Sequence, residues 1–482
     1  MTDLKKIFYC AILLAWASSA QAQKSRPVYV TITGIDLLPK DSTQAICVKD
    51  ITVKGCKKTK EYIVSREIPF KKGDSLSVSS IRKQLELARQ QVYNTTLFES
   101  VTIEAVITSA STMSVKVDLK ERWYIYPVPQ FQLVDRNYND WIQKHNASLD
   151  RVNYGIKFVH YNLSGRRDQL RIYLINGYTR NVSITYSNPY SNAKLNEGFS
   201  MGTGYSQNRE IPYATDSNNN SLFYKRSDFV RNNVFASAGY NIRKGLFKKH
   251  FFTLGFVHYK VDDSVIYDKN PHYFGERVTS KTIVDLSYIF QYTNVNNVSY
   301  PLKGTSFLIA LMKRGLGLTG GINMFSAEAW FSKYYPLGKK WFTSFQLNGK
   351  IKLPFEQAYI NQRGLGYGES YLRGLETYVI DGVATALAKA TLKRKLLSFN
   401  IPFPFFPKVI KKIPFTFFAK TYADLGYSYN TKTNYSRLNN RLLYTGGFGI
   451  DILTLYDINL RFEYSFNQLH ENGLFLHNQS GF

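Results

Sequence analysis

From Trp123 to the end of the chain, apolar and polar residues alternate in short segments. In Ile458–Asn467 every even-numbered residue is apolar and every odd-numbered residue is polar, and most of Trp341–Leu353 alternates in the same way. A period of two predicts β-strands whose two faces meet different surroundings. After residue 22 no run of about 18 apolar residues remains, so the sequence predicts no transmembrane helix.

Two architectures have such strands, a soluble β-sandwich and a membrane-spanning β-barrel. The chain contains 36 tyrosines and 33 phenylalanines in 482 residues, and membrane barrels place aromatic residues in girdles at both membrane surfaces. About sixteen strand segments can be counted, an even number as single-chain bacterial barrels require. With an export signal, these features favour an all-β membrane protein with a 16-stranded antiparallel barrel over residues 123–482.

The first 22 residues have the features of a cleaved signal peptide. Lys5 and Lys6 precede the apolar run Ile7–Ala17, and Ala20-Gln21-Ala22 is a small-x-small cleavage site. Export from a bacterial cell is therefore expected, with residues 23–45 as an N-terminal segment of the mature chain.

Only two cysteines, Cys47 and Cys56, remain after residue 22. In one extended segment they would lie about 30 Å apart, so a disulfide would need a turn between them. Two unpaired cysteines are the expectation, with the disulfide left open.

The formal net charge is +27. An exported protein rarely meets nucleic acid, so the expected anionic partners are outer-membrane lipids and lipopolysaccharide phosphates. Solvated loops and a charged lumen explain the excess equally well.

Residues 46–122 have a mixed pattern that predicts a small α/β domain. Alternation over Ile46–Val53 predicts a strand, Tyr62–Ile68 a short helix, and Ser79 or Ser80 the cap of a second helix. Two strands follow around Val101, Ile103 and Ala105 and around Val115–Leu119, giving the order β-α-α-β-β. Val28–Ile32 indicates at most a stray strand. The edge of strand Val101–Ile107 is a candidate docking site for an extended client, although an ordinary edge strand has the same sequence.

The segment Arg363–Gly382 is rich in glycine and charge although it lies among barrel strands. It is too polar for lipid and too rich in glycine to predict a strand. We expect the loop 354–379, between strands eleven and twelve, to fold into the lumen, with Arg373 contacting the wall. Gly364, Gly366 and Gly368 do not indicate a nucleotide site, because no strand–loop–helix unit surrounds them.

The alternation around Asp424 predicts that its side chain faces the lumen. Phe415, Phe417, Ala419, Ala423 and Leu425 share one face of that strand, and Lys420 and Asp424 share the other. A guanidinium in a narrow lumen needs a hydrogen-bonded anion, and Asp424 points into the lumen, where an inserted Arg373 could meet it.

Pro127 and Pro129 lie in or just before the first barrel strand. Two prolines spaced two residues apart both lack the N–H that would face the same neighbouring strand. If they precede the membrane region they stiffen the linker, which is the favoured interpretation. If that neighbour is the last strand, they weaken the seam where the barrel closes.

Two sets of motifs resemble a known superfamily. The sequences GCKKTKEYIVSREIPFKKGDSL, TTLFESVTIE and VKVDLKERW resemble a POTRA domain. Leu372-Arg373-Gly374-Leu375 is similar to the hydrophobic-Arg-Gly-aromatic tetrad of BamA/TamA-type barrels, and Asp424 with Gly426 to its partner motif on strand thirteen. Leu375 departs from the usual aromatic residue. An acidic residue on strand twelve is also missing; that face carries Thr385, Lys389, Lys393 and Lys395.

The chain therefore resembles a bacterial surface antigen barrel with a single POTRA domain, and the C-terminal Phe482 resembles an outer-membrane insertion signal. The resemblance implies a periplasmic POTRA domain that docks unfolded outer-membrane proteins, and a barrel that delivers them into or across the outer membrane. It also implies accessory subunits and a seam that opens toward lipid. No nucleic acid, cofactor, metal or catalytic residue is expected, and no enzyme activity. A passive channel or receptor, or a dedicated polypeptide exporter, is the alternative.

Overall fold

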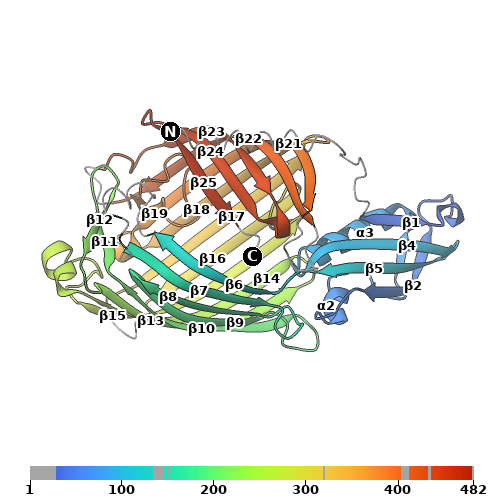
Figure 1. Ribbon diagram of the computed structural model, residues 1–482, viewed down its shortest axis with the longest axis horizontal. Coiled ribbons are helices and arrows are strands. Elements are labelled where there is room, and N and C mark those ends of the chain that lie inside the picture. Colours follow the sequence, from blue (N-terminus) through green and yellow to red (C-terminus); the bar gives the residue numbers. More distant parts are fainter. Residues whose placement is uncertain are drawn as a thin grey trace.

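The computed structural model describes residues 29–133, 146, 148, 151–317, 321–402, 412–431 and 436–479. Within these residues a small α/β domain lies at one end of a large curved sheet that forms a barrel (Figure 1). The signal peptide expected at 1–22 and the terminal Phe482 lie outside the described residues.

The small domain is a five-stranded sheet in the order β1-β4-β5-β2-β3, with two helices. Its elements are β1 (Val30–Thr33), the 3-10 turn η1 (Ile35–Leu37), β2 (Ala45–Lys54), α2 (Glu61–Ser65), β3 (Ser75–Ser77), α3 (Val78–Tyr93), β4 (Phe98–Ser109) and β5 (Thr112–Glu121). The two helices and the three long strands follow the expected order. Helix α3 begins after Ser77, whose side chain forms no cap hydrogen bond, so the expected cap at Ser79 or Ser80 is wrong. Both Cys47 and Cys56 are free.

Strand β4 is an inner strand of this sheet, which corrects the prediction of a docking edge there. It pairs in parallel with β1, which places Val30 opposite Ile103 and Ile32 opposite Ala105, and antiparallel with β5 on its other side. Val101, Ile103 and Ala105 are fully buried. The outer strands of the described sheet are β1 and β3, each too short to show a clear alternation in the sequence.

Sixteen strands form the barrel, which confirms the expected number. They are β6 (Ile125–Leu133), β7 (Val152–Tyr161), β8 (Gln169–Gly177), β9 (Thr179–Asn188), β10 (Glu197–Asn208), β13 (Arg231–Lys244), β14 (Lys248–Val261), β15 (Ser280–Val295), β16 (Gly304–Arg314), β17 (Met324–Pro336), β18 (Trp341–Leu353), β21 (Ala384–Pro402), β22 (Lys412–Tyr429), β23 (Leu443–Leu453), β24 (Asn459–Asn467) and β25 (Asn472–Gln479). Each strand pairs antiparallel with the next along the chain. No helix among the described residues is long and apolar enough to cross a membrane.

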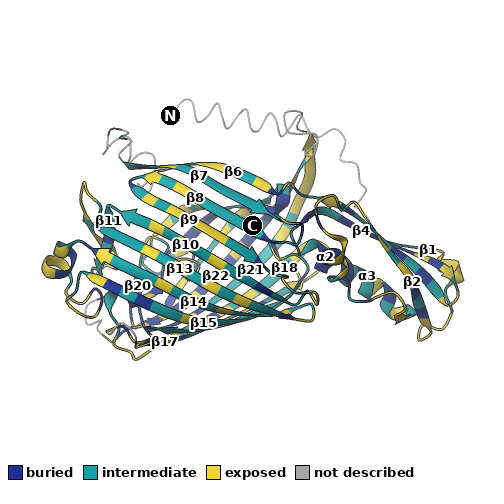
Figure 2. Cartoon of the chain, turned by 90° about the horizontal axis from the view of Figure 1, so that it is seen from below, coloured by how far each residue is buried: buried dark blue, intermediate teal, exposed yellow. Residues whose placement is uncertain are grey.

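The alternation in the sequence becomes an inner and an outer face. In β24, Asn459, Glu463 and Ser465 are at most 1% exposed, whereas Phe462 is 39% and Phe466 46% exposed. Figure 2 shows this as exposed bands alternating with less exposed bands along the strands. Polar residues thus line the lumen and apolar residues face outward, as in a membrane barrel.

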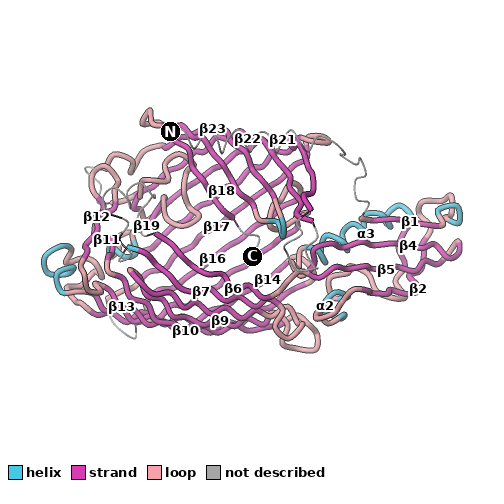
Figure 3. The backbone as a smooth tube through the Cα atoms, in the orientation of Figure 1, coloured by secondary structure: helices cyan, strands magenta, loops and turns pink. Residues whose placement is uncertain are grey.

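The two ends of the barrel differ in their connections (Figure 3). Short turns join the strands at the end next to the small domain, where η5 (Leu455–Asp457) lies. The far end has longer connections, which contain β11 (Glu210–Thr215), β12 (Ser221–Lys225), the π-helical turn η3 (Val265–Lys269), η4 (Tyr359–Asn361), β19 (Arg363–Leu365) and β20 (Ile380–Asp381). An apolar cluster holds these far-end loops together: Ile211, Val230, Val261, Val265, Ile266, Tyr273 and Phe274.

Two buried ion pairs join the small domain to the barrel. Arg243 Nη2 donates to Glu67 Oε2 at 2.6 Å, and the Tyr190 hydroxyl donates to Glu67 Oε1 at 3.0 Å. Arg122 Nη2 donates to Asp457 Oδ2 at 2.7 Å. Breaking one partner of a buried ion pair destabilises by about 3–5 kcal/mol because the other charge stays buried. These contacts therefore fix the position of the small domain.

We predict that Glu67→Gln loosens the small domain from the barrel at neutral pH. Burial alone would raise the pKa of Glu67, but the Arg243 charge and hydrogen bond outweigh it and lower this pKa below its usual range. A carboxylate with a lowered pKa stabilises the docked state above its ordinary pKa, and this stabilisation is lost as the pH falls through the lowered value. The wild-type domain should thus stay docked at pH 7 and loosen only in acid.

The docking of the small domain on the barrel can be measured as the distance between spin labels at the exposed positions 83 and 339. The labels are introduced in a variant that lacks Cys47 and Cys56. At pH 7 the distance distribution should broaden in Glu67→Gln and stay narrow in Glu61→Gln, a matched control on exposed residue Glu61. A distribution in Glu67→Gln as narrow as that of the wild type would contradict the anchoring role.

Candidate functional site: the lumen loop and its wall

The loop between β18 and β21, here called the lumen loop, joins barrel strands eleven and twelve as expected. Its segment Arg363–Gly382 was predicted to contain no strand, but β19 and β20 pair there, with Arg363 opposite Asp381. The glycines permit this pairing because the backbones approach closely. A Cβ on Gly364 would lie 2.4 Å from the carbonyl oxygen of Ile380.

Arg373 and Asp424 meet inside the barrel. The Arg373 backbone N–H donates to Asp424 Oδ2 at 3.0 Å, and Nε donates to the same oxygen at 2.9 Å. Nη2 also donates to Asp424 Oδ1, so one residue supplies three donors to this carboxylate. Asp424 has no exposed side-chain surface, and that of Arg373 is 10% exposed. Charge-assisted bonds of this kind are stronger than neutral ones.

The remaining surroundings of the guanidinium are also ordered. Nη1 donates to Thr391 Oγ1 at 3.0 Å, and Nη2 lies 3.4 Å from the carbonyl oxygen of Ala390. The guanidinium carbon lies 4.0 Å from the centre of the Tyr422 ring, close enough for a cation–π interaction. Side chains of β21 and β22 therefore hold Arg373 on three sides.

The neighbours of Arg373 in the tetrad are shaped for close contact. Gly374 has φ +94, and a Cβ there would lie 2.8 Å from Ser465 Cβ. A Cβ on Gly426 would lie 2.7 Å from Leu372 Cδ1. Leu372 and Leu375 are 1% and 2% exposed and belong to one apolar cluster. Leu375 is therefore well packed at the position where the tetrad that it resembles has an aromatic ring.

Beside this pair the wall carries a second charged network. Lys420 pairs with Glu463 at 2.6 Å and also with Asp451, and Lys393 pairs with Asp451 at 3.4 Å. Asp451 lies on β23. Its position explains how Lys393 on strand twelve is neutralised although that strand lacks the acidic residue expected from the resemblance to BamA/TamA-type barrels. The alternation predicted which residues face the lumen, but not which residues of neighbouring strands lie next to one another along the barrel axis.

Three groups that sequence reasoning missed lie together next to the network. Glu376, Glu463 and His477 have potential metal-ligand atoms within 4.8 Å of one another. Their carboxylates have other partners: His477 Nε2 lies 3.1 Å from Glu376 and 3.4 Å from Glu463, which also pairs with Lys420. Glu376 belongs to the lumen loop and His477 to β25, so these contacts tie the loop to the last strand. Glu463 and His477 lie on the neighbouring strands β24 and β25, but Glu376 comes from the distant lumen loop, so no spacing pattern could have revealed the three together.

The proline pair lies in strand β6, so the favoured linker interpretation is wrong. Pro127 and Pro129 pair opposite Phe158 and Ile156 of β7. Tyr161 N–H donates to the Tyr124 carbonyl. Every second residue counted from Tyr124 therefore directs its backbone N–H and C=O toward β7, and the residues between them direct these groups to the other side. The nitrogens of both prolines therefore face away from β7.

That side of β6 is the seam of the barrel. β6 and β25 are the two ends of the sheet, with no backbone pairing between them among the described residues. On β25, Leu474 and Leu476 are 71% and 66% exposed. The weak-seam alternative therefore agrees with the position of the prolines.

Comparisons with known proteins agree with this geometry. Residues 46–122 match the family described as "POTRA: Surface antigen variable number repeat", so the small domain is a POTRA domain. No curated protein sequence matches the chain.

Among solved structures, CdiB from Escherichia coli is 13% identical over 90% of this chain and 75% of that chain, with a TM-score of 0.53. BamA from Haemophilus ducreyi lacking POTRA domains 1–3 is 17% identical over 91% and 84%, with a TM-score of 0.49. CdiB from Acinetobacter baumannii is 12% identical over 90% and 73%, with a TM-score of 0.46. The POTRA match and the fold shared with E. coli CdiB confirm the resemblance to a surface antigen barrel.

We predict that Arg373→Ala destabilises the barrel by about 3–5 kcal/mol, since Asp424 would stay buried without its partner. The double variant Arg373→Ala/Asp424→Ala removes both charges and should lose less stability than the two single variants summed. Arg441→Ala, on an exposed arginine, is the matched control. Urea unfolding in detergent measures these differences. A single variant as stable as the control would show that the pair contributes nothing.

Proposed function

We propose that this protein docks unfolded polypeptides on its POTRA domain in the periplasm and inserts them as β-barrels into the outer membrane. The observation that carries this proposal is the seam between β6 and β25, where the described residues show no backbone pairing. A barrel that spans a membrane passively gains from full closure, because unpaired backbone groups in hydrocarbon cost several kcal/mol each. An open seam is instead useful to a protein that adds strands.

The two edges of the seam differ chemically. β25 presents an edge of ordinary backbone groups, whereas β6 lacks the donors of Pro127 and Pro129 on the same side. An unpaired edge is a template for another strand. A client strand can therefore pair with β25 more completely than β6 can.

The lumen loop supports insertion over passive conduction. Its contacts run from Thr391 on β21 through Asp424 on β22 to His477 on β25, so it crosses the inside of the wall. A loop fixed there occupies part of the lumen and so opposes free conduction. A dedicated exporter is the alternative that shares this fold. It would release the client on the far side of the membrane, whereas an insertion factor would leave the client in the bilayer.

The orientation and the docking strand follow from the same architecture. Longer loops of outer-membrane barrels face the outside, so the POTRA domain at the end with short turns would face the periplasm. Ile103 N–H donates to the Tyr29 carbonyl, so alternate residues Val30 and Ile32 direct their backbone groups away from β4. Strand β1 thus replaces β4 as the candidate edge for an extended client. We propose that the protein acts without catalytic residues or a cofactor.

Client insertion into liposomes tests the proposal. The reconstituted protein should accelerate folding of an outer-membrane barrel several-fold, and deletion of the POTRA residues 46–122 should abolish the effect. Protease protection shows whether the client is in the bilayer or inside the vesicle. No acceleration together with steady ion conductance would favour a channel, and transfer into the vesicle interior would favour an exporter.

We also predict that Pro127→Val/Pro129→Val slows client insertion. The change adds two N–H donors that face β25, and each new hydrogen bond contributes about 0.5–1.5 kcal/mol. Seam closure should raise the unfolding temperature while insertion slows. Pro271→Val, on an exposed loop proline, is the control and should change neither. Faster insertion by the double variant would contradict a weak seam as the working element.

A further inference from the structure

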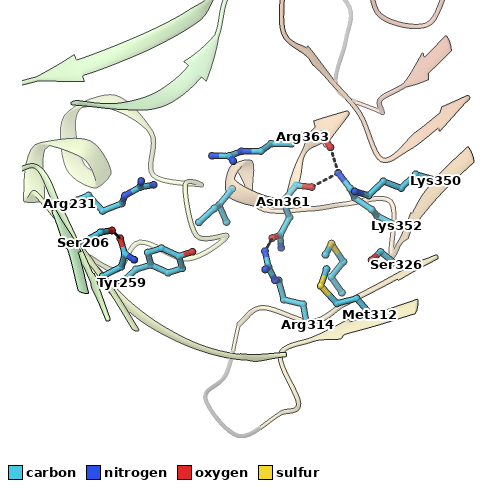
Figure 4. A pocket seen from close by; sticks show the side chains of 13 residues that line it. Ser206, Arg231, Tyr259, Met312, Arg314, Ser326, Lys350, Lys352, Asn361 and Arg363 are labelled. Atoms are coloured by element: carbon cyan, nitrogen blue, oxygen red, sulfur yellow. Dashed lines mark hydrogen bonds between the residues drawn. The ribbon is translucent and has the colours of Figure 1, made fainter. Parts of the chain in front are cut away.

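A cavity of about 390 Å³ lies inside the barrel, between the lumen loop and the wall strands β13, β16 and β18. Five of the side chains that line it are basic: Arg231, Arg314, Lys350, Lys352 and Arg363 (Figure 4). The acidic groups around these cations decide whether the cavity is neutral or attracts anions.

Three of the five cations have strong partners. Arg314 Nη2 donates to Asp285 Oδ2 at 2.9 Å, and Lys350 pairs with Glu328 at 3.3 Å. Lys352 Nζ donates to the carbonyl oxygens of Asn361, Arg363 and Gly382 and so fastens the loop to the wall. These three side chains are occupied by structural contacts.

Arg231 and Arg363 differ from them. Arg231 donates to Asn208 Oδ1 at 2.9 Å, and Arg363 lies over the Tyr367 ring at 5.5 Å. Asp381, opposite Arg363 in the β19–β20 pair, accepts the Tyr367 hydroxyl at 2.8 Å. Among the described residues no ion pair joins Asp381 or another carboxylate to either arginine. Neither guanidinium group therefore has an ion-pair partner among the described residues, and the charge of Arg363 acts on Asp381 only through space.

Their arrangement leaves a space for an anion. In Figure 4 the guanidinium ends of Arg231 and Arg363 point toward each other across the cavity. The five cations face three nearby carboxylates, those of Asp285, Glu328 and Asp381, which leaves two positive charges in excess. Two facing guanidinium groups repel each other unless an anion lies between them. Their planar forks match the oxygens of a phosphate group, which each can bind in bidentate fashion.

We propose that this cavity binds a phosphate group between Arg231 of the barrel wall and Arg363 of the lumen loop. Bound phosphate would hold the loop to β13, strand six of the barrel, whereas Arg373 holds it to β22, strand thirteen. The loop would then be fixed on nearly opposite sides of the lumen. Free phosphate and the phosphates of lipopolysaccharide offer the same chemistry. The proposal does not depend on client insertion.

Calorimetry on the purified full-length protein in detergent tests this site, with inorganic phosphate as the probe and sodium chloride at matched ionic strength. Wild-type protein should bind phosphate saturably. Arg231→Gln and Arg363→Gln should each weaken binding at least tenfold, whereas Arg277→Gln, on an exposed arginine outside the cavity, should bind as the wild type does. Phosphate should raise the unfolding temperature of the wild type but of neither cavity variant, and that scan also shows that the variants fold.

Titration with lipopolysaccharide in the same detergent identifies the source of the phosphate. Competition with inorganic phosphate that depends on both arginines assigns the cavity to the lipid phosphates. Lipopolysaccharide binding that is equal in all variants, with phosphate binding still lost in the two cavity variants, assigns it to a soluble anion. Equal effects of chloride and phosphate, or phosphate binding unchanged in both cavity variants, would overturn the proposal.

Discussion

The buried pair between Arg373 and Asp424 is the contact on which the organisation of the lumen depends. Asp424 has no solvent contact, and an ionised carboxylate in that position is stable only with a charged, hydrogen-bonding partner. The wall has Lys389 opposite Asp424 on β21, but the donors that reach Asp424 come from the loop. The carboxylate therefore requires the loop to be inside the barrel, and the tight fits at Gly374 and Gly426 follow from that entry.

This dependence makes the barrel asymmetric. The loop is tied to β21 and β22 through Arg373 and to β25 through the contact of Glu376 with His477. Strand β6 has no such contact among the described residues, and its free edge lacks two donors. One side of the seam is thus held from within by the lumen loop, while β6 on the other side pairs with β7. A rigid edge beside a weakly held one is the arrangement that lets a new strand enter without unfolding the barrel.

The strand phase could be predicted from the sequence because it depends on a local rule, whereas the pairing of Arg373 with Asp424 was indicated by the resemblance of the tetrad and of the strand-thirteen motif. Alternation determines the face of the strand on which each residue lies, and it predicted that Asp424 faces the lumen. The glycine content and the charge of Arg363–Gly382 predicted that the loop lies inside the lumen. The missed features depend on contacts between distant segments or on very short elements. Strand β1 has four residues, too few for a pattern, yet it covers β4 and moves the free edge of the POTRA sheet. The spacing of Pro127 and Pro129 predicted that both missing donors face the same neighbouring strand, but it did not predict that β6 begins at Ile125.

The lumen loop is held to the wall in different ways at Arg373 and at Arg363. At Arg373 the wall supplies the anion, so the contact is complete within the folded chain. At Arg363 the loop meets Arg231 of the wall across a cavity, and the local carboxylates serve other cations or a hydroxyl. Repulsion between two guanidinium groups falls when an anion binds between them, so this second attachment depends on what the lumen contains. The attachments of the loop at Arg373, Lys352 and Glu376 are thus complete within the chain, whereas the contact between Arg363 and Arg231 is set by its surroundings and responds to a change in the membrane or the solution.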